Sequence, residues 1–349
     1  MLSVAIVCYA LRPVRMKILL CSYRFAPDIG GIESVGELLA QNFVRLGHQV
    51  RVATASGGDA NHPAATFETI RSPTLQILAD LYQWSEIVLH NQLSARFVWP
   101  WFRFPRPIFF IHHTFPSQEP NWLRRFLKLQ LCRLGTNLAV SDALAQSLPL
   151  RPIRVHNPFR YDLFRSVTRS QDQRHCIFVG RLVPGKEVDC LLRALALSAR
   201  RGVIRSATIV GEGPERQRLE KLADGLPIAF VGARTGRALA ELLAAHRYLV
   251  LPSARNETFG LVALEAIAAG CVVIGSDHGG IPEAIGPCGV IFPAGDVVAL
   301  AEFLIHPPAI PDFDRSAALH LVPYHPERVA REYLGLFEKE LHRRKITKE

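Results

Sequence analysis

The chain has 349 residues, of which 49% are hydrophobic, so it is too long for one ordinary domain and too apolar to be disordered. Its 41 basic and 31 acidic residues give a formal charge of +10, which predicts an anionic partner: nucleic acid, an acidic membrane surface or phosphorylated small molecules. No apolar run reaches the roughly 18 residues that span a bilayer. The starting expectation is two packed α/β domains of roughly 150–180 residues each.

The cysteines and the first residues predict a cytoplasmic protein. The seven cysteines are scattered, mostly within apolar runs, and none forms a C-x-x-C pair, which is typical of reduced, buried thiols. The apolar stretch from Leu2 to Leu11 is short and no basic residue precedes it, so we predict no signal peptide. A first strand is expected from about Met16, and residues 1–15 are therefore predicted to be an extension without function.

The following residues predict a first domain in which strands alternate with helices. Lys17–Ser22 is an apolar strand, a turn with Gly30 and Gly31 follows it, and an amphipathic pattern predicts a helix to about Leu46. The alternation that continues from there predicts a doubly wound parallel sheet. Further strands are expected at 50–53, 87–89, 108–111, 137–140 and 153–155, and the longest helix at 122–134.

Two adjacent histidines follow one of these strands. The strand 108–111 runs directly into His112 and His113, at the carboxyl end of a strand, which is where open α/β sheets bind ligands. A single histidine is more often structural, but a pair at such an edge favours a site. The residues alone leave both histidines as candidates.

A polar, irregular stretch at 157–175 is predicted to link this domain to a second one. Arg181 and Lys186 lie at the two ends of the loop after the next strand, where the guanidinium could pair with a diphosphate in bidentate fashion and the ammonium as a point charge. Gly211 lies in a later G-E-G-P turn, which either only connects a strand to a helix or also contacts a nucleotide. Strands are expected at 176–179, 207–210, 228–231, 248–251, 272–275 and 289–293, and a last helix at about 327–341.

A buried strand of the second domain is predicted to enter a helix through a loop that carries Glu257. Gly260 has no side chain, so the phosphates of a ligand can approach the N–H groups of Leu261 and Val262 at the positive end of the helix dipole. Glu265 lies just past the first turn of this helix, so both carboxylates can face one ligand. Carboxylates beside an anion site need hydroxyl groups to bind, and a nucleotide sugar offers both hydroxyl groups and phosphates.

Glu257, Phe259, Gly260 and Glu265 form the pattern E-x-F-G-x-x-x-x-E, which resembles the signature of retaining glycosyltransferases of family 4. The resemblance covers residues 17–341 through four motifs in the same order. It implies the GT-B fold, in which two Rossmann-like, doubly wound parallel-sheet domains face each other across a cleft. The implied units are an N-terminal extension (1–15), an acceptor-side domain (16–160), a nucleotide-sugar-binding domain (161–325) and a C-terminal helix that crosses back to the first domain (326–349).

The resemblance also implies roles for single residues. His113 fits the family's histidine beside the donor sugar better than His112, Glu257 would hold the same sugar, and Glu265 would bind the ribose hydroxyls. Glu187 replaces the family's usual glycine, a departure that bears on the geometry of this turn and not on the presence of the cations Arg181 and Lys186. The other implied contacts with the donor are Gly30, Gly31, Arg181, Lys186, Gly211, Val231, Phe259, Gly260, Leu261 and Val262. No residue is named as a covalent nucleophile.

The implied activity is transfer of a sugar from a UDP- or GDP-sugar to a glycan, lipid-linked or small-molecule acceptor, with no cofactor and no metal ion. The rival interpretations are a nucleotide-sugar epimerase, for which Asp28, Glu33 and Glu119 are the available acid/base carboxylates, and a non-catalytic binding protein. No nucleic-acid motif accompanies the positive charge. The D-x-D at 312–314 and the N-x-T at 256–258 are interpreted as solvated acids and as an unused glycosylation sequence.

The predicted helix at 122–134 combines apolar and basic side chains. This pattern is typical of a helix that lies on an anionic membrane leaflet, and equally of a helix packed on a sheet with a solvated basic face. We therefore hypothesise peripheral attachment to the inner face of the cytoplasmic membrane through the first domain. The apolar residues concerned are Trp122, Phe126, Leu129 and Leu134, and the basic ones are Arg124, Arg125, Lys128 and Arg133.

Overall fold

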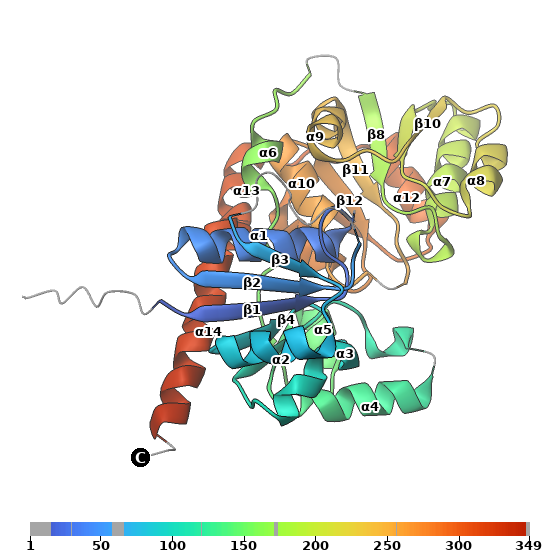
Figure 1. Cartoon of the computed structure of the whole chain (residues 1–349). Coiled ribbons are helices and arrows are strands. Elements are labelled where there is room, and N and C mark those ends of the chain that lie inside the picture. Colours follow the sequence, from blue (N-terminus) through green and yellow to red (C-terminus); the bar gives the residue numbers. More distant parts are fainter. Residues whose placement is uncertain are drawn as a thin grey trace, which may run out of the picture.

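The structure is a computed structural model that describes residues 15–28, 30–57, 66–119, 121–170, 174–255 and 257–346. The predicted extension 1–15 lies outside the described residues except for Arg15, and so does Asn256 of the N-x-T sequence. Two parallel sheets form two α/β domains, and the chain crosses from one domain to the other twice (Figure 1).

The first domain is built on a seven-stranded sheet with the order β3-β2-β1-β4-β5-β6-β7, in which all neighbouring strands are parallel. The order reverses between β1 and β4, so the sheet is doubly wound, as predicted. Every residue of β1 after Lys17 is buried, as expected for a strand covered on both faces. The strands are β1 (Lys17–Ser22), β2 (Gln49–Thr54), β3 (Glu68–Arg71), β4 (Ile87–His90), β5 (Ile108–His112), β6 (Thr136–Ala139) and β7 (Ile153–Arg154).

Helices cover both faces of this sheet (Figure 1). Two of them begin at a hydroxyl cap, because the side chains of Thr74 and Ser141 accept hydrogen bonds from N–H groups in the first turns of α2 and α5. The helices are α1 (Gly31–Arg45), α2 (Leu75–Trp84), α3 (Ala95–Val98), α4 (Trp122–Cys132) and α5 (Asp142–Ser147).

The second domain has a six-stranded parallel sheet with the order β10-β9-β8-β11-β12-β13. Its strands are β8 (Arg174–Val179), β9 (Ala207–Val210), β10 (Ile228–Gly232), β11 (His246–Leu251), β12 (Val272–Ser276) and β13 (Gly289–Phe292). Its helices are α7 (Val188–Arg200), α8 (Arg216–Leu222), α9 (Gly236–Ala244), α10 (Leu261–Ala269), α11 (Ile281–Ile285), α12 (Val297–Ile305) and α13 (Phe313–Leu321).

The first crossing between the domains is more ordered than the sequence predicted. The stretch expected to be an irregular linker contains α6 (Tyr161–Arg165), and the side chains of Phe159 and Phe164 are buried in the core. α6 has only 5 residues, which is too short for a helical period to be seen in a stretch rich in charged residues.

The last helix, α14 (Pro326–Ile346), packs against the first domain. The ring of Phe337 lies 4.7 Å from that of Phe109 on β5 and 5.8 Å from that of Phe43 on α1. One hydrophobic core therefore continues from the first sheet through α14 into α10 of the second domain. None of the helices in the described ranges is long and apolar enough to cross a membrane.

Candidate active site

The predicted site residues lie where parallel strands end. Since neighbouring strands in the second sheet are parallel, the loops after β8, β9 and β11 leave the sheet at the same edge. The loop after β11 carries Glu257 and ends at Gly260, whose φ of 92° is left-handed and favours glycine. From there α10 begins at Leu261 and ends at Gly270. The predicted strand, loop and helix are all present.

Glu257 and Lys186, 71 positions apart, form an ion pair between the carboxylate Oε2 and the ammonium Nζ. Their side chains are 14% and 25% exposed, so the pair is largely shielded from water. The turn that carries Lys186 packs against the β11 loop, because a Cβ on Gly185 would lie 3.4 Å from the carbonyl oxygen of Arg255. The two residues predicted to hold the sugar and the diphosphate are thus side by side.

Glu265 is a half-buried carboxylate on α10 that makes no side-chain hydrogen bond within the described part of the chain. Burial raises its pKa to about 7, although the positive charge of Arg160 acts in the opposite direction. Arg160 is itself paired with Glu37 of α1 at 2.6 Å. Glu265 therefore has oxygens available for the hydroxyl groups of a ligand, and it ionises only near neutral pH.

His113 is buried directly after β5, and its Nε2 lies 3.0 Å from Oδ1 of Asn91. The amide nitrogen of Asn91 donates to the carbonyl oxygen of Ile32 at 2.8 Å and to Oγ of Ser22 at 3.2 Å. Asn91 Oδ1 is therefore left to accept from His113 Nε2–H. Burial, reinforced by the neighbouring His112, lowers the pKa of His113 to about 3, so the imidazole is neutral.

His112 has a different environment from His113. Its Nε2 lies 2.9 Å from Oδ1 of Asn137, whose amide donates to the carbonyl oxygen of Cys132 at 3.0 Å. Successive residues at a strand end point to opposite sides. Of the two candidates, His113 is the one whose backbone contacts the second domain, since its carbonyl oxygen accepts a hydrogen bond from Oγ1 of Thr258 at 3.0 Å.

Gly30 and Gly31 begin α1 and face the second domain. A Cβ on Gly31 would lie only 3.2 Å from Cδ1 of Leu261, the first residue of α10. A Cβ on Gly30 would clash with the carboxylate of Glu33. The starts of α1 and α10 therefore approach each other closely, and their N–H groups point out of two neighbouring helix ends.

Arg181, Gly211 and Val231 follow or end three adjacent strands of the second sheet. Arg181 is exposed, and Val231 is half-buried beside an irregularity in β10. Gly211 has a φ of 145°, and a Cβ there would clash with the carbonyl oxygen of Gly180. Close backbone packing is therefore sufficient to explain a glycine at position 211 without a contact to a nucleotide.

Phe259 is placed in the core, because its side chain is 2% exposed and its ring lies 5.5 Å from that of Tyr324. Only its backbone can therefore approach a ligand. Leu261 and Val262 are half-buried at the start of α10 and pack against the shared core.

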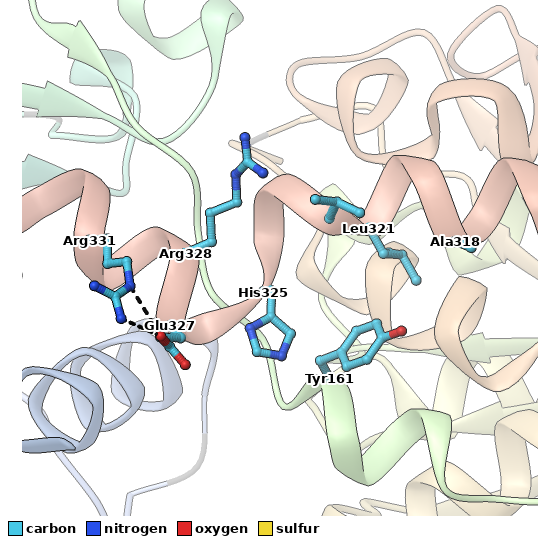
Figure 2. A pocket seen from close by; sticks show the side chains of 8 residues that line it. Tyr161, Ala318, Leu321, His325, Glu327, Arg328 and Arg331 are labelled. Carbon is cyan, nitrogen blue, oxygen red and sulfur yellow. Dashed lines mark hydrogen bonds and ion pairs between the residues drawn. The ribbon is translucent and has the colours of Figure 1, made fainter. Parts of the chain in front are cut away.

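A hollow of about 430 Å³ lies elsewhere, where the two crossings between the domains meet (Figure 2). None of the predicted site residues lines it. Its walls come from α6, α13 and the start of α14, and include Tyr161, Leu321, His325 and Arg328.

Sequence reasoning missed the polar residues that join the two domains at this site. They are Ser141, Arg154, Thr258 and Glu283. Sequence reasoning also missed Asn91, which contacts His113 within the first domain. Asn91 could have been found, because it follows a buried strand at the same sheet edge as His113. The others act through single hydrogen bonds and an ion pair between distant segments, which leave no local pattern.

Residues 173–306 match a family model described as glycosyl transferases group 1. The chain is 43% identical over 191 residues to a GDP-mannose-dependent alpha-mannosyltransferase of Mycobacterium tuberculosis, covering 50% of this chain and 47% of that protein. It is 35% identical over 191 residues to the D-inositol 3-phosphate glycosyltransferase of Streptomyces coelicolor, covering 48% and 42%. The matched part is thus less than half of each of these relatives.

Two solved structures share the fold over nearly the whole chain. Anabaena HepE, in complex with UDP and glucose, superposes with a TM-score of 0.74 at 19% identity, covering 93% of this chain and 100% of HepE. WaaG, a glycosyltransferase involved in lipopolysaccharide biosynthesis, superposes with a TM-score of 0.63 at 21% identity, covering 90% and 98%. The predicted fold, GT-B with two Rossmann-like domains, is confirmed.

The environment of Glu265 predicts a pH-dependent stability. Its pKa is raised from the ordinary 4.5 to about 7, so between these values the folded protein retains a proton that the unfolded chain has lost, and stability falls as pH rises through this window. Glu265→Gln should therefore raise the melting temperature by roughly 2–6 °C at pH 8 and by less at pH 5. Thermal unfolding at both pH values measures this. The exposed Asp224→Asn is the control, and an equal shift of Glu265→Gln at both pH values would contradict the raised pKa.

Proposed function

We propose that this chain, whose residues 173–306 form a group 1 glycosyltransferase domain within a GT-B fold, is a retaining glycosyltransferase of family 4. Its donor would be a UDP- or GDP-sugar and its acceptor a glycan or a lipid-linked or small molecule. The relatives support a nucleotide sugar as donor, since one is named as GDP-mannose-dependent and the structure of HepE contains UDP.

The observation that carries this proposal is the Lys186–Glu257 pair beside the start of α10. A cation and unpaired N–H groups suit a diphosphate, while the carboxylates of Glu257 and Glu265 suit sugar and ribose hydroxyls. If the site bound only a free anion, two carboxylates so close to it, one in the loop and one in α10, would repel that anion. A ligand with both phosphates and hydroxyls satisfies all of these groups.

In the mechanism that we favour, the second domain holds the nucleoside diphosphate and the first domain binds the acceptor. Arg181, Lys186 and the N–H groups at the start of α10 stabilise the negative charge that develops on the departing diphosphate. Glu257 and His113 would contact the donor sugar. Because His113 is neutral and its Nε2–H is directed to Asn91, its contribution is a hydrogen bond and not a positive charge.

The proposal is tested by incubating the purified protein with a panel of nucleotide sugars and acceptors. We expect sugar transfer, or slow hydrolysis of the donor when no acceptor is present. Formation of an epimer would support the rival enzyme, and a protein that changes none of the donors would be a binding protein.

Glu265→Ala and Lys186→Ala should each reduce transfer about a hundredfold, because a hydrogen bond to a charged group contributes roughly 1.5–3 kcal/mol. Lys221→Ala, an exposed lysine on α8, is the control. Full activity in either site variant would disprove the assignment.

Transfer should also be independent of metal ions. Arg181, Lys186 and the positive end of α10 supply the charge that a magnesium ion would otherwise bring to the diphosphate. We expect the same rate with a chelator as with added magnesium. Loss of activity in chelator that magnesium restores would show that this diphosphate site is incomplete.

We also propose that the protein attaches peripherally to a membrane, and α4 at the edge of the first domain supports this (Figure 1). Trp122, Leu123, Phe126 and Leu127 are 70%, 49%, 51% and 52% exposed. At spacings of four residues they form one apolar surface. We call these four residues the α4 surface. Leu129 and Leu134, which were predicted to share this face, are instead half-buried, and Leu134 packs against the core of the first domain.

The charges around the α4 surface complement an anionic leaflet. Arg124 and Arg125 form no ion pair with any described residue, and α4 itself contains no acidic residue. Lys128 is paired with Glu119 at 2.6 Å. Each free cation near an anionic leaflet contributes about 1 kcal/mol, and the exposed apolar side chains add to this at the headgroup boundary.

The membrane proposal predicts co-sedimentation with anionic vesicles at low salt, little with neutral vesicles, and release at high salt. Replacing Trp122 and Phe126 together by serine should abolish binding and leave donor hydrolysis unchanged, because neither residue lies at the site. Leu319→Ser, on α13 and 66% exposed, is the matched control. A wild-type protein that stays in the supernatant, or that self-associates through this surface in sedimentation velocity, would contradict membrane attachment.

A further inference from the structure

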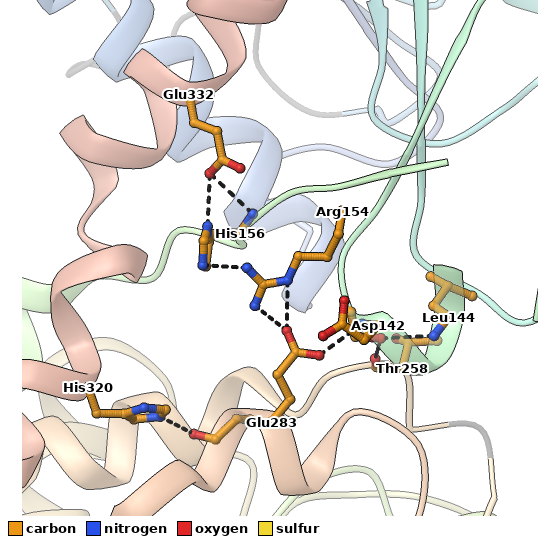
Figure 3. A network of polar contacts seen from close by, with 10 residues as sticks. Asp142, Leu144, Arg154, His156, Thr258, Glu283, His320 and Glu332 are labelled. Atoms are coloured by element: carbon orange, nitrogen blue, oxygen red, sulfur yellow. Dashed lines mark hydrogen bonds and ion pairs between the residues drawn. The ribbon is translucent and has the colours of Figure 1, made fainter. Parts of the chain in front are cut away.

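The loop that carries Glu257 is hydrogen-bonded to the first domain through its next residue (Figure 3). Oγ of Ser141, the residue before α5, donates to the carbonyl oxygen of Thr258 at 2.6 Å. Oγ1 of Thr258 donates in turn to the carbonyl oxygen of His113 at 3.0 Å. Thr258 thus connects the residue proposed to hold the donor sugar to the strand end that carries His113.

The same loop packs tightly on its own domain. A Cβ on Gly279 would clash with the carbonyl oxygen of Glu257, and a Cβ on Gly280 with that of Thr258. The N–H of Gly280 also donates to the carbonyl oxygen of Glu257 at 3.2 Å. The loop is therefore packed as part of the second domain, so its contacts with the first domain depend on how the two domains are placed.

A second contact between the domains lies nearby. The guanidinium of Arg154 on β7 is paired with the carboxylate of Glu283 on α11, and the side chains are 26% and 19% exposed. Glu283 Oε2 also accepts from the N–H of Asp142 at 2.9 Å. Arg154 contacts His156, whose Nδ1 lies 2.9 Å from Glu332 of α14 (Figure 3).

We propose that Thr258, Ser141 and the Arg154–Glu283 pair are positioning residues that set Glu257 against His113 when the two domains come together. The inference rests on the proposed transfer reaction. None of the four is assigned a contact with the donor; they act on the backbone of the loop and on the spacing of the domains. The two neutral hydrogen bonds, the partly exposed ion pair and the hydrogen bond from the N–H of Asp142 to Glu283 are each of modest net strength, so this contact can open and re-form with each catalytic cycle.

The first test is Thr258→Val, which keeps the shape and removes the hydroxyl. Transfer should fall about threefold to tenfold in kcat, the effect of one neutral hydrogen bond. The dissociation constant for UDP or GDP should stay unchanged within about twofold, because the groups proposed to bind the nucleotide lie on the second domain. Thr258→Ser keeps the hydroxyl and should restore kcat. An unchanged kcat, or a nucleotide affinity that falls in parallel with kcat, would overturn the proposal.

The second test does not depend on activity. Small-angle scattering of Arg154→Gln combined with Thr258→Val should give a larger radius of gyration than the wild type, with an unchanged melting temperature of the second domain. The exchange of Arg154→Glu with Glu283→Arg should restore the compact value. No expansion in the first variant would overturn the positioning contact, even in a protein that transfers sugars. If the variant expands but the wild-type protein transfers no sugar from any donor, the contact between the domains is supported. The transferase proposal, on which the catalytic role of this contact rests, is then refuted.

Discussion

Every pair of neighbouring strands in both sheets is parallel, and this constraint places the site. In a parallel sheet all loops that follow strands emerge at one edge, so residues far apart in sequence meet there without any special contact of their own. Lys186 after β8 and Glu257 after β11 meet in this way. His113 follows β5 of the other sheet and reaches the same loop through Thr258.

The charged groups at this edge lower the free energy of unfolding, and the same groups are available to bind a ligand. A half-buried carboxylate such as Glu265, which has no hydrogen-bond partner among the described residues, raises the free energy of the folded state near neutral pH. Ion-paired Glu257 is less costly, because Lys186 supplies the opposite charge. Such perturbed groups are concentrated at functional sites, and the continuous core beneath α10 provides the stability that offsets them.

The sequence alone was sufficient for the alternation of strands and helices, for the glycine at the start of α10, and for the positions of Glu257 on the loop and Glu265 on the helix. It was not sufficient for β3, an edge strand without a buried face, or for α6, which has only 5 residues and lies in a stretch rich in charged residues. The residues alone left His112 and His113 undecided, and only the family resemblance favoured His113, since adjacent residues at a strand end point to opposite sides and the covering elements decide which side faces the site. The pairing of Lys186 with Glu257 depends on strand order, which periodicity does not encode.

The return of α14 to the first domain has a consequence for biosynthesis. Phe43 and Phe109 acquire their partner Phe337 only when the last part of the chain has been made. Roughly 190 residues separate the end of β7 from the end of α14, which at ribosomal rates of about 5–20 residues per second is a delay of roughly 10–40 s. During that interval the first sheet has all its strands, but Phe43 and Phe109 lack the contact with Phe337 that they make in the folded protein. The core of the first domain is therefore complete only after α14 has been made and has folded back onto it.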